Sequence, residues 1–152
     1  AALAEVPARY AVQVAQPEGV VVPRGHDAFL RPYAMRTSGK PVSTHFRSDL
    51  HYFDPEKGEP NAVHEFEVVF GSKETDAPTV LFVPEYQYPD GFYVWLSDGY
   101  ATWSADDQRL YWWPERDEPG WRHSARIRPP VAGRDAGDWD YFVRGDQVVS
   151  AR

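Results

Sequence analysis

Two glutamates lie two positions apart in a stretch that alternates apolar and polar residues. They are Glu65 and Glu67, on either side of Phe66. In an extended strand, their Cα atoms would be about 7 Å apart and both side chains would point to the same face. By distance alone, such a pair could carry the two-carboxylate chemistry of glycoside hydrolysis. Acidic residues on the outer face of a half-buried strand are more usually solvated, and we interpret the pair in that way.

The residues that other catalytic and metal sites require are missing or differently spaced. The chain has no Cys, which excludes thiolate ligands and Cys nucleophiles. No serine has the Gly-x-Ser-x-Gly setting of a nucleophile elbow, and no Gly-rich phosphate loop is present. The five His residues lack the spacing of a helical zinc site, and Asp135, Asp138 and Asp140 lack that of a helix-loop-helix calcium site. We therefore predict no catalytic residue, no metal site and no cofactor in this chain.

Aromatic residues are the most informative feature of the sequence. The chain has 6 Trp, 9 Tyr and 8 Phe, and nearly half of these rings fall within one stretch of its second half. Such rings can stack on a sugar, fill a core or seal an interface with another domain. Because strand residues alternate between faces, we predict that Phe92, Val94 and Leu96 point inwards and leave Tyr93 and Trp95 outside.

A second pair of rings supports the same conclusion. Adjacent Trp112 and Trp113 cannot both enter one core, because neighbouring strand residues face opposite ways. Some large rings must therefore be exposed or covered by another molecule. We predict a ligand- or partner-binding surface made of Tyr93, Trp95, Trp112 and Trp113. Packing in the core or against another domain is the favoured role of the rings, and a ligand platform is the alternative.

The elements that position these rings are expected to be short strands. The chain has 14 Pro and 11 Gly but only six Leu, which disfavours long amphipathic helices. Apolar and polar residues alternate from His64 to Phe70, and a continuous apolar run from Thr79 to Val83 lies between two prolines. Similar segments recur every ~8–12 residues, with turn residues between them. We therefore predict an all-β fold, an antiparallel β-sandwich of roughly seven to nine short strands.

The chain divides into three predicted parts. Residues 1–29 are expected to form an extended arm or linker and residues 30–130 the sandwich, while residues 131–152 form a C-terminal loop or tail that packs its three aromatic residues on the sandwich. The 16 basic and 23 acidic residues give a net charge of −7, which opposes binding to nucleic acid. Uninterrupted apolar runs are too short for a transmembrane segment.

Several segments, taken in order, resemble a known family. They are similar to the start, an early hairpin and two strands of the C-terminal β-sandwich that follows the catalytic barrel in glycoside hydrolase family 5 enzymes of the endoglycoceramidase type. The resemblance covers about residues 28–130. It is carried by Leu30–Ala34, Ser38–Pro41, Phe53–Pro55, Ala77–Pro84 and Tyr88–Val94.

The resemblance implies a role without catalysis. The family hydrolyses β-glycosidic bonds of glycolipids with a glutamate nucleophile and a glutamate acid/base, both on the barrel, and no glutamate of this chain lies in a matching motif. It implies an accessory sandwich that packs on a catalytic barrel or a partner chain and could contact carbohydrate or a glycolipid headgroup. The alternative is a structural subunit that docks onto a larger protein complex by exposed aromatics, and a third interpretation is an intact small hydrolase. A secreted or cell-envelope location is favoured.

The sequence departs from the family pattern in three places. An insertion lies between Phe46 and Phe53, and the last 22 residues extend beyond the pattern. Prolines and a glycine interrupt residues 1–27, where the last helix of a barrel is expected. The barrel is therefore expected further upstream or on a separate chain, or it is absent.

Overall fold

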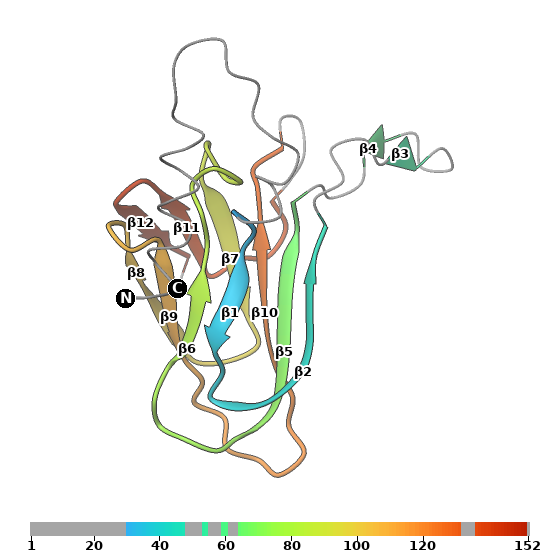
Figure 1. Ribbon diagram of the computed structural model, residues 1–152, viewed down its shortest axis with the longest axis vertical. Coiled ribbons are helices and arrows are strands. Elements are labelled where there is room, and N and C mark those ends of the chain that lie inside the picture. The colour runs from blue at the N-terminus through green and yellow to red at the C-terminus, as the bar shows by residue number, and fades with distance from the viewer. Residues whose placement is uncertain (1–29, 48–52, 55–58, 61–63, 132–135, 152) are drawn as a thin grey trace. The chain divides into compact units, whose positions relative to one another are not determined.

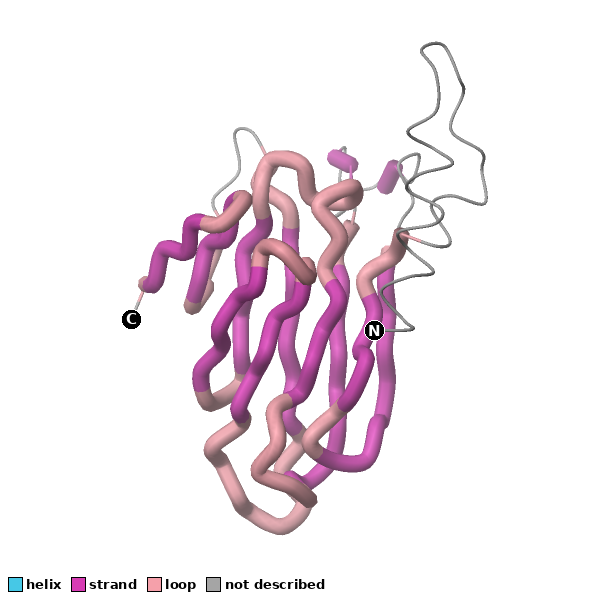
Figure 2. Tube along the Cα trace, turned by 60° about the vertical axis from the view of Figure 1, so that its left-hand side comes forward, coloured by secondary structure: helices cyan, strands magenta, loops and turns pink. Residues whose placement is uncertain are grey.

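Short strands of this chain form two antiparallel β-sheets that pack face to face (Figure 1). The computed structural model describes residues 30–47, 53–54, 59–60, 64–131 and 136–151. No helix occurs among these residues, and Figure 2 shows the strands in two layers. The all-β sandwich predicted from the sequence is confirmed. The predicted arm of residues 1–29 lies outside the described residues.

The two sheets contain four and six strands. The four-stranded sheet has the order β1 (Tyr33–Arg36), β6 (Thr79–Phe82), β9 (Arg109–Trp113) and β8 (Tyr100–Ser104). The six-stranded sheet has the order β12 (Gln147–Ser150), β11 (Tyr141–Arg144), β7 (Phe92–Leu96), β10 (His123–Arg128), β5 (Phe66–Lys73) and β2 (Gly39–Phe46). Two further short strands pair with each other, β3 (Phe53–Asp54) and β4 (Glu59–Pro60).

The core lies between the two sheets and is made by every second residue of their strands. On β7, Phe92, Val94 and Leu96 are buried, whereas Tyr93 and Trp95 are half-buried on the outer face, as the alternation predicts. β5 follows the same alternation, because Phe66, Val68 and Phe70 are buried and the residues between them are half-buried. Among the largest fully buried side chains are Trp112, Phe66, Phe70, Leu81, Leu110 and Ile127. Burying each such side chain contributes about 1.5–3 kcal/mol.

The C-terminal part adds a hairpin to the six-stranded sheet, where the sequence analysis expects a loop or tail. β11 pairs with β7, with Phe142 opposite Tyr93, and β12 pairs with β11. The turn contains Gly145, whose φ of 59° is free of strain only for glycine, followed by Asp146. A Gly-Asp pair between two apolar runs is a hairpin signal, so the sequence does encode this element. The ring centroids of Trp139 and Phe142 lie 5.4 and 4.7 Å from that of Tyr93.

Asp98, in the turn between β7 and β8, joins several parts of the sandwich. Its Oδ2 accepts hydrogen bonds from the backbone amides of Glu115 and Arg116, at 2.9 and 2.7 Å. Its Oδ1 lies 2.8 Å from Nδ1 of His123, which is fully buried on β10. Its backbone carbonyl accepts a hydrogen bond from Nε1 of Trp112 at 2.8 Å. One residue therefore holds the β7–β8 turn, the β9–β10 loop and two core side chains together.

The protonation of Asp98 is coupled to folding. Burial acts to raise the pKa of Asp98, but hydrogen bonds from the Arg116 amide, from His123 and from Ser97 outweigh it and hold the pKa below its ordinary value of 3.8. A carboxylate whose pKa is lower in the folded state stabilises the fold above its unfolded-state pKa. That contribution is lost as the pH falls through the folded-state pKa.

We therefore expect the free energy of unfolding to decrease as the pH falls from about 5 to about 2. Asp98→Asn should lower it by about 1–3 kcal/mol at pH 7, because two backbone amides lose a charged acceptor, and should flatten this pH dependence. Urea unfolding followed by Trp fluorescence at several pH values measures both effects. Asp106→Asn, at an exposed position of the β8–β9 turn, is the control. A pH dependence as steep in Asp98→Asn as in the unmodified chain contradicts the assignment.

Candidate functional site

The four residues predicted to form one binding surface lie in three different places. Tyr93 and Trp95 are on the outer face of the six-stranded sheet, because their neighbours on β7 fill the core. Trp113 is on the outer face of the four-stranded sheet, and Trp112 is in the core. The two outer faces are on opposite sides of the sandwich, so the structure brings together Tyr93 and Trp95 but not the complete set.

Trp112 was expected on the exposed surface, and that expectation is wrong. Its side chain is 0% exposed and its ring centroid lies 5.2 Å from that of Phe70. The register explains the placement, because Trp112 pairs with Thr79 on β6 and with Ala101 on β8, and both of these neighbours face the core. The prediction that only one of Trp112 and Trp113 enters the core is correct.

The outer face of the six-stranded sheet is occupied by its own side chains. Tyr93 packs against rings contributed by the C-terminal hairpin and the residues before it. The guanidinium carbon of Arg126 lies 5.0 Å from the centroid of the Trp95 ring. Nε of Arg126 is also 3.1 Å from a carboxylate oxygen of Glu67. The rings on this face therefore already have partners within the chain.

The glutamate pair belongs to the same face. Glu67 is bound by Arg126, and a carboxylate oxygen of Glu65 lies 3.8 Å from Nε of Arg128. All four side chains are partly exposed. Each carboxylate thus has its own arginine. Neither lines the pocket that the β6–β7 loop forms with the β8–β9 and β11–β12 turns. This arrangement favours a solvated, ion-paired face over a pair of catalytic carboxylates.

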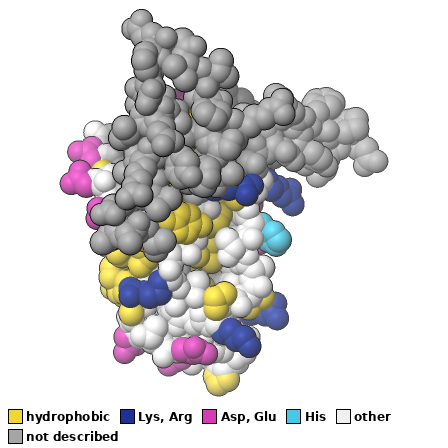
Figure 3. All heavy atoms as spheres, in the orientation of Figure 1, with side chains coloured by type: hydrophobic (Ala, Val, Ile, Leu, Met, Phe, Trp, Pro, Cys, Tyr) yellow, Lys and Arg dark blue, Asp and Glu magenta, His cyan; other side chains and the backbone are white. Residues whose placement is uncertain are grey.

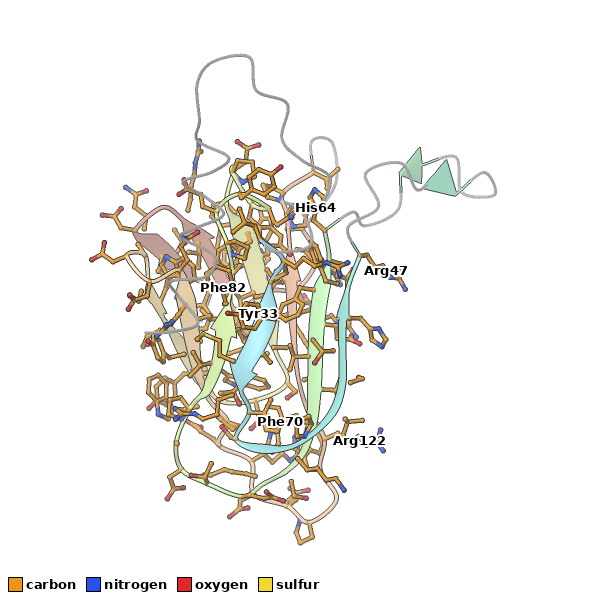
Figure 4. All side chains as sticks on the ribbon, viewed as in Figure 1. Tyr33, Arg47, His64, Phe70, Phe82 and Arg122 are labelled. Carbon is orange, nitrogen blue, oxygen red and sulfur yellow. The ribbon has the colours of Figure 1, made fainter. Side chains whose placement is uncertain are left out.

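The outer face of the four-stranded sheet carries rings from all four strands. Trp113 stacks on Tyr100 with ring centroids 5.3 Å apart and an interplanar angle of 14°, and on Tyr111 at 6.4 Å and 29°. Tyr33 packs on Phe82 at 5.3 Å, as the side-by-side rings on β1 and β6 show in Figure 4. We call these five residues the aromatic strip. Tyr100 is the most open of them, at 45% exposed, whereas Phe82 is buried, at 6% exposed.

The charges on this face differ from those of the chain as a whole. None of the four strands contains an Asp or a Glu, although the chain has a net charge of −7. Arg36 pairs with Val80 and Arg109 pairs with Phe82 across neighbouring strands, which places both arginines on the same face as the strip. In Figure 3 the visible surface below the grey atoms carries hydrophobic, basic and uncharged polar side chains, and a few acidic side chains lie at its left and lower edges. Among the described residues, the four strands of this face therefore carry aromatic and basic side chains and no acidic ones.

The stacking of the rings decides which partner the strip suits. A ring that stacks on its neighbour has that face covered, whereas binding to a sugar requires an open ring face. Stacking covers a face of each of the Trp113, Tyr100 and Tyr111 rings, and Tyr100 is the most exposed of the three. An array of this kind suits packing against another protein surface, where aromatic residues are enriched.

Most of the strip was not identified in the sequence. Only Trp113 belongs to the predicted set. Applying the alternation rule to Arg109–Trp113, with Leu110 inside, would have placed Tyr111 outside as well. No sequence signal places Tyr33 and Phe82 beside these rings, because that depends on the strand order of the sheet.

The described residues give no evidence of a metal centre or a membrane span. In those ranges no three His, Asp or Glu side chains are grouped so that they could hold a metal ion. Asp135, one of the three acidic residues considered above, lies outside the described residues. No helix in the described part of the chain is long and apolar enough to cross a membrane.

The model of the glycoside hydrolase family 5 C-terminal domain matches residues 31–127. No curated protein matches the sequence.

Solved structures with the same fold come from longer enzymes. Cryptococcus neoformans sterylglucosidase 1 matches with a TM-score of 0.54 and 18% identity, over 72% of this chain and 15% of that chain. Endo-glycoceramidase II from Rhodococcus sp. matches with a TM-score of 0.52 and 17% identity, over 78% of this chain and 23% of that chain. The same Rhodococcus enzyme in its ganglioside GM3 complex matches with a TM-score of 0.52 and 16% identity, over 75% of this chain and 22% of that chain. The chain thus spans less than a quarter of the length of these structures.

The positions of the two adjacent tryptophans predict very different effects of mutation. Trp112→Ala should lower the free energy of unfolding by about 3–5 kcal/mol, because it leaves a cavity in the core. Trp113→Ala should lower it by about 1 kcal/mol or less, because Trp113 lies on an outer face. Urea unfolding of the two variants of the 152-residue chain compares them directly. Equal losses in the two variants contradict the assigned orientation of β9.

Proposed function

Because this chain belongs to the glycoside hydrolase family 5 C-terminal domain family, we propose that it is a non-catalytic accessory domain that packs on a catalytic barrel through its aromatic strip. The observation that carries the proposal is the strip itself. It joins the outer rings of four strands on a sheet whose strands contain no carboxylate. Large domain interfaces are apolar at their centre and depleted in acidic residues, as this face is.

The outer face of the six-stranded sheet is less suited to packing against a barrel. Its carboxylates and arginines form ion pairs within the chain, and its rings pack on one another and on Arg126. Covering it with another domain would remove the Glu65–Arg128 and Glu67–Arg126 pairs from water, which costs free energy. Covering the partly exposed rings of the strip, chiefly Tyr100 and Trp113, would remove apolar surface from water, which is favourable. The four-stranded sheet is therefore the side that a barrel would cover.

The chemistry of the reaction is assigned to the barrel. The two glutamates closest to each other in this chain are each bound to an arginine. Neither Glu65 nor Glu67 is among the residues that line the pocket formed by the β6–β7 loop and the β8–β9 and β11–β12 turns. The domain would contribute by burying its strip and holding the barrel in place.

A contact with carbohydrate or with a glycolipid headgroup is a second candidate function. It is favoured by the neighbours, because endo-glycoceramidase II from Rhodococcus sp. has been solved with ganglioside GM3. In this chain such a contact would use Tyr93 and Trp95, which are half-buried on the outer face of the six-stranded sheet. Quenching of Trp fluorescence by glucosylceramide or by an oligosaccharide would support it, and no quenching with any sugar would count against it.

Docking onto a larger complex other than a glycosidase would use the same aromatic strip. The nature of the partner separates the two cases. A partner that hydrolyses β-glycosides supports the accessory domain, and a partner without this activity supports the structural subunit.

The strip is tested by Tyr100→Ser combined with Trp113→Ser in the natural enzyme that carries this domain. Loss of two central aromatic anchors, each worth about 2 kcal/mol or more at an interface, should release the domain from the barrel. We expect limited proteolysis to separate the two at least tenfold faster, and thermal unfolding to split into two transitions.

Two controls accompany this double variant. Val149→Ser replaces an apolar side chain that is 55% exposed on the other sheet and should leave both readouts unchanged. The double variant in the 152-residue chain should lose about 1 kcal/mol or less per site in the free energy of unfolding, which shows that it folds. If proteolysis separates the domain of the double variant from the barrel no faster than that of the unmodified protein, although the variant domain is folded, the proposed packing face is wrong.

A further inference from the structure

A pocket of about 150 Å³ lies at one end of the sandwich, between the β6–β7 loop, the β8–β9 turn and the β11–β12 turn. Three aromatic residues line it, namely Tyr88, Phe92 and Trp103. The ring centroids of Tyr88 and Phe92 are 5.5 Å apart, and those of Phe92 and Trp103 are 5.2 Å apart. Tyr88 and Phe92 are almost fully buried and Trp103 is half-buried. Trp103 therefore presents the most accessible ring of this cluster.

Hydrogen bonds fix the segments that surround the pocket. Nε1 of Trp103 donates to the carbonyl oxygen of Gly145 at 2.8 Å, which ties the indole to the β11–β12 turn. Oε1 of Gln108 accepts from the amide of Glu85 at 2.7 Å, and the Gln108 carbonyl accepts from the amide of Val83 at 2.9 Å. Gln108 has a φ of 54°, a left-handed conformation that a residue other than glycine keeps only when its surroundings hold it. The pocket is thus formed before any ligand arrives.

The rim of the pocket is acidic. Glu85 and Asp146 are exposed residues of the lining, and the lining contains no Lys, Arg or His. A cation near this rim is attracted by two carboxylates and by the negative faces of aromatic rings. An anion is repelled by the same groups. A cavity of about 150 Å³ is large enough for a group of about the size of benzene.

We propose that this pocket binds a small methylated ammonium group, of which choline is the simplest example. The bulky methyl groups would contact the apolar wall, and the positive charge would lie between the ring of Trp103 and the carboxylates of Glu85 and Asp146. The site is separate from the aromatic strip, and this proposal does not depend on the packing proposed for that face.

The test uses choline and its neutral isostere 3,3-dimethylbutan-1-ol, which has the same shape without the charge. We expect choline to shift the NMR signals of the Trp103 indole N–H and of the Gly145 amide in a saturable way, with a dissociation constant in the millimolar range typical of so small a ligand. The isostere should bind at least about fivefold more weakly, because it lacks the attraction of the carboxylates and the rings.

Variants locate the binding site on the protein. Glu85→Gln and Asp146→Asn should each weaken choline binding about fivefold, the effect expected for one partly solvated charge pair. Both residues are exposed, so the fold should be unchanged. Asp117→Asn, an exposed acidic residue of the β9–β10 loop, removes the same charge at a distance and should leave the affinity unchanged.

Three results would overturn the proposal. They are the absence of a saturable shift with choline, equal binding of choline and the neutral isostere, and unchanged affinity in both carboxylate variants. A neutral sugar that shifts the same signals while choline does not would assign the pocket to carbohydrate and also overturn it. Vesicles of phosphatidylcholine, added in parallel with free choline, distinguish a lipid headgroup from a soluble ligand when choline binds.

Discussion

A strand residue that enters the core places its two neighbours on the opposite face of the sheet. This constraint governs the sandwich because aromatic residues are concentrated in strands of only five residues, β7, β8 and β9. On β9, Leu110 and Trp112 fill the core, and Tyr111 and Trp113 must therefore lie outside. A chain with 15% aromatic residues cannot bury all of its rings between two sheets. The rings that remain outside determine what each outer face can do.

The two outer faces accommodate their rings in different ways. On the six-stranded sheet, Trp139 and Phe142 pack on Tyr93 and Arg126 packs on Trp95, so these two rings have partners within the chain. On the four-stranded sheet, the rings stack on one another beside arginines and without acidic neighbours in the strands. The difference follows from topology, because the hairpin extends the six-stranded sheet. The packing that we propose therefore uses the aromatic strip and not the outer face of the six-stranded sheet.

The sequence was sufficient for the fold class and for the orientation of β7. Phe92, Val94 and Leu96 form an apolar set that only one face can accept, and the core accepted it. It was not sufficient for Trp112 and Trp113, because a tryptophan lies on each face whichever way β9 turns. Leu110 decides the orientation of β9, because it is buried in the core and places Trp112, two residues later, on the same face. The complete aromatic strip could not be predicted from the sequence, since Tyr33 and Phe82 belong to it only through the strand order β1-β6-β9-β8.

The central claim is that the aromatic strip is the surface that a catalytic barrel covers. Hydroxyl-radical footprinting of a family 5 enzyme that carries this domain, compared with the 152-residue chain alone, measures this most directly. The account predicts that oxidation of Tyr100 and Trp113 falls several-fold in the enzyme, while oxidation of Trp95 on the opposite face stays the same. Equal oxidation of Tyr100 and Trp113 in both samples, with protection of Trp95 instead, would contradict it.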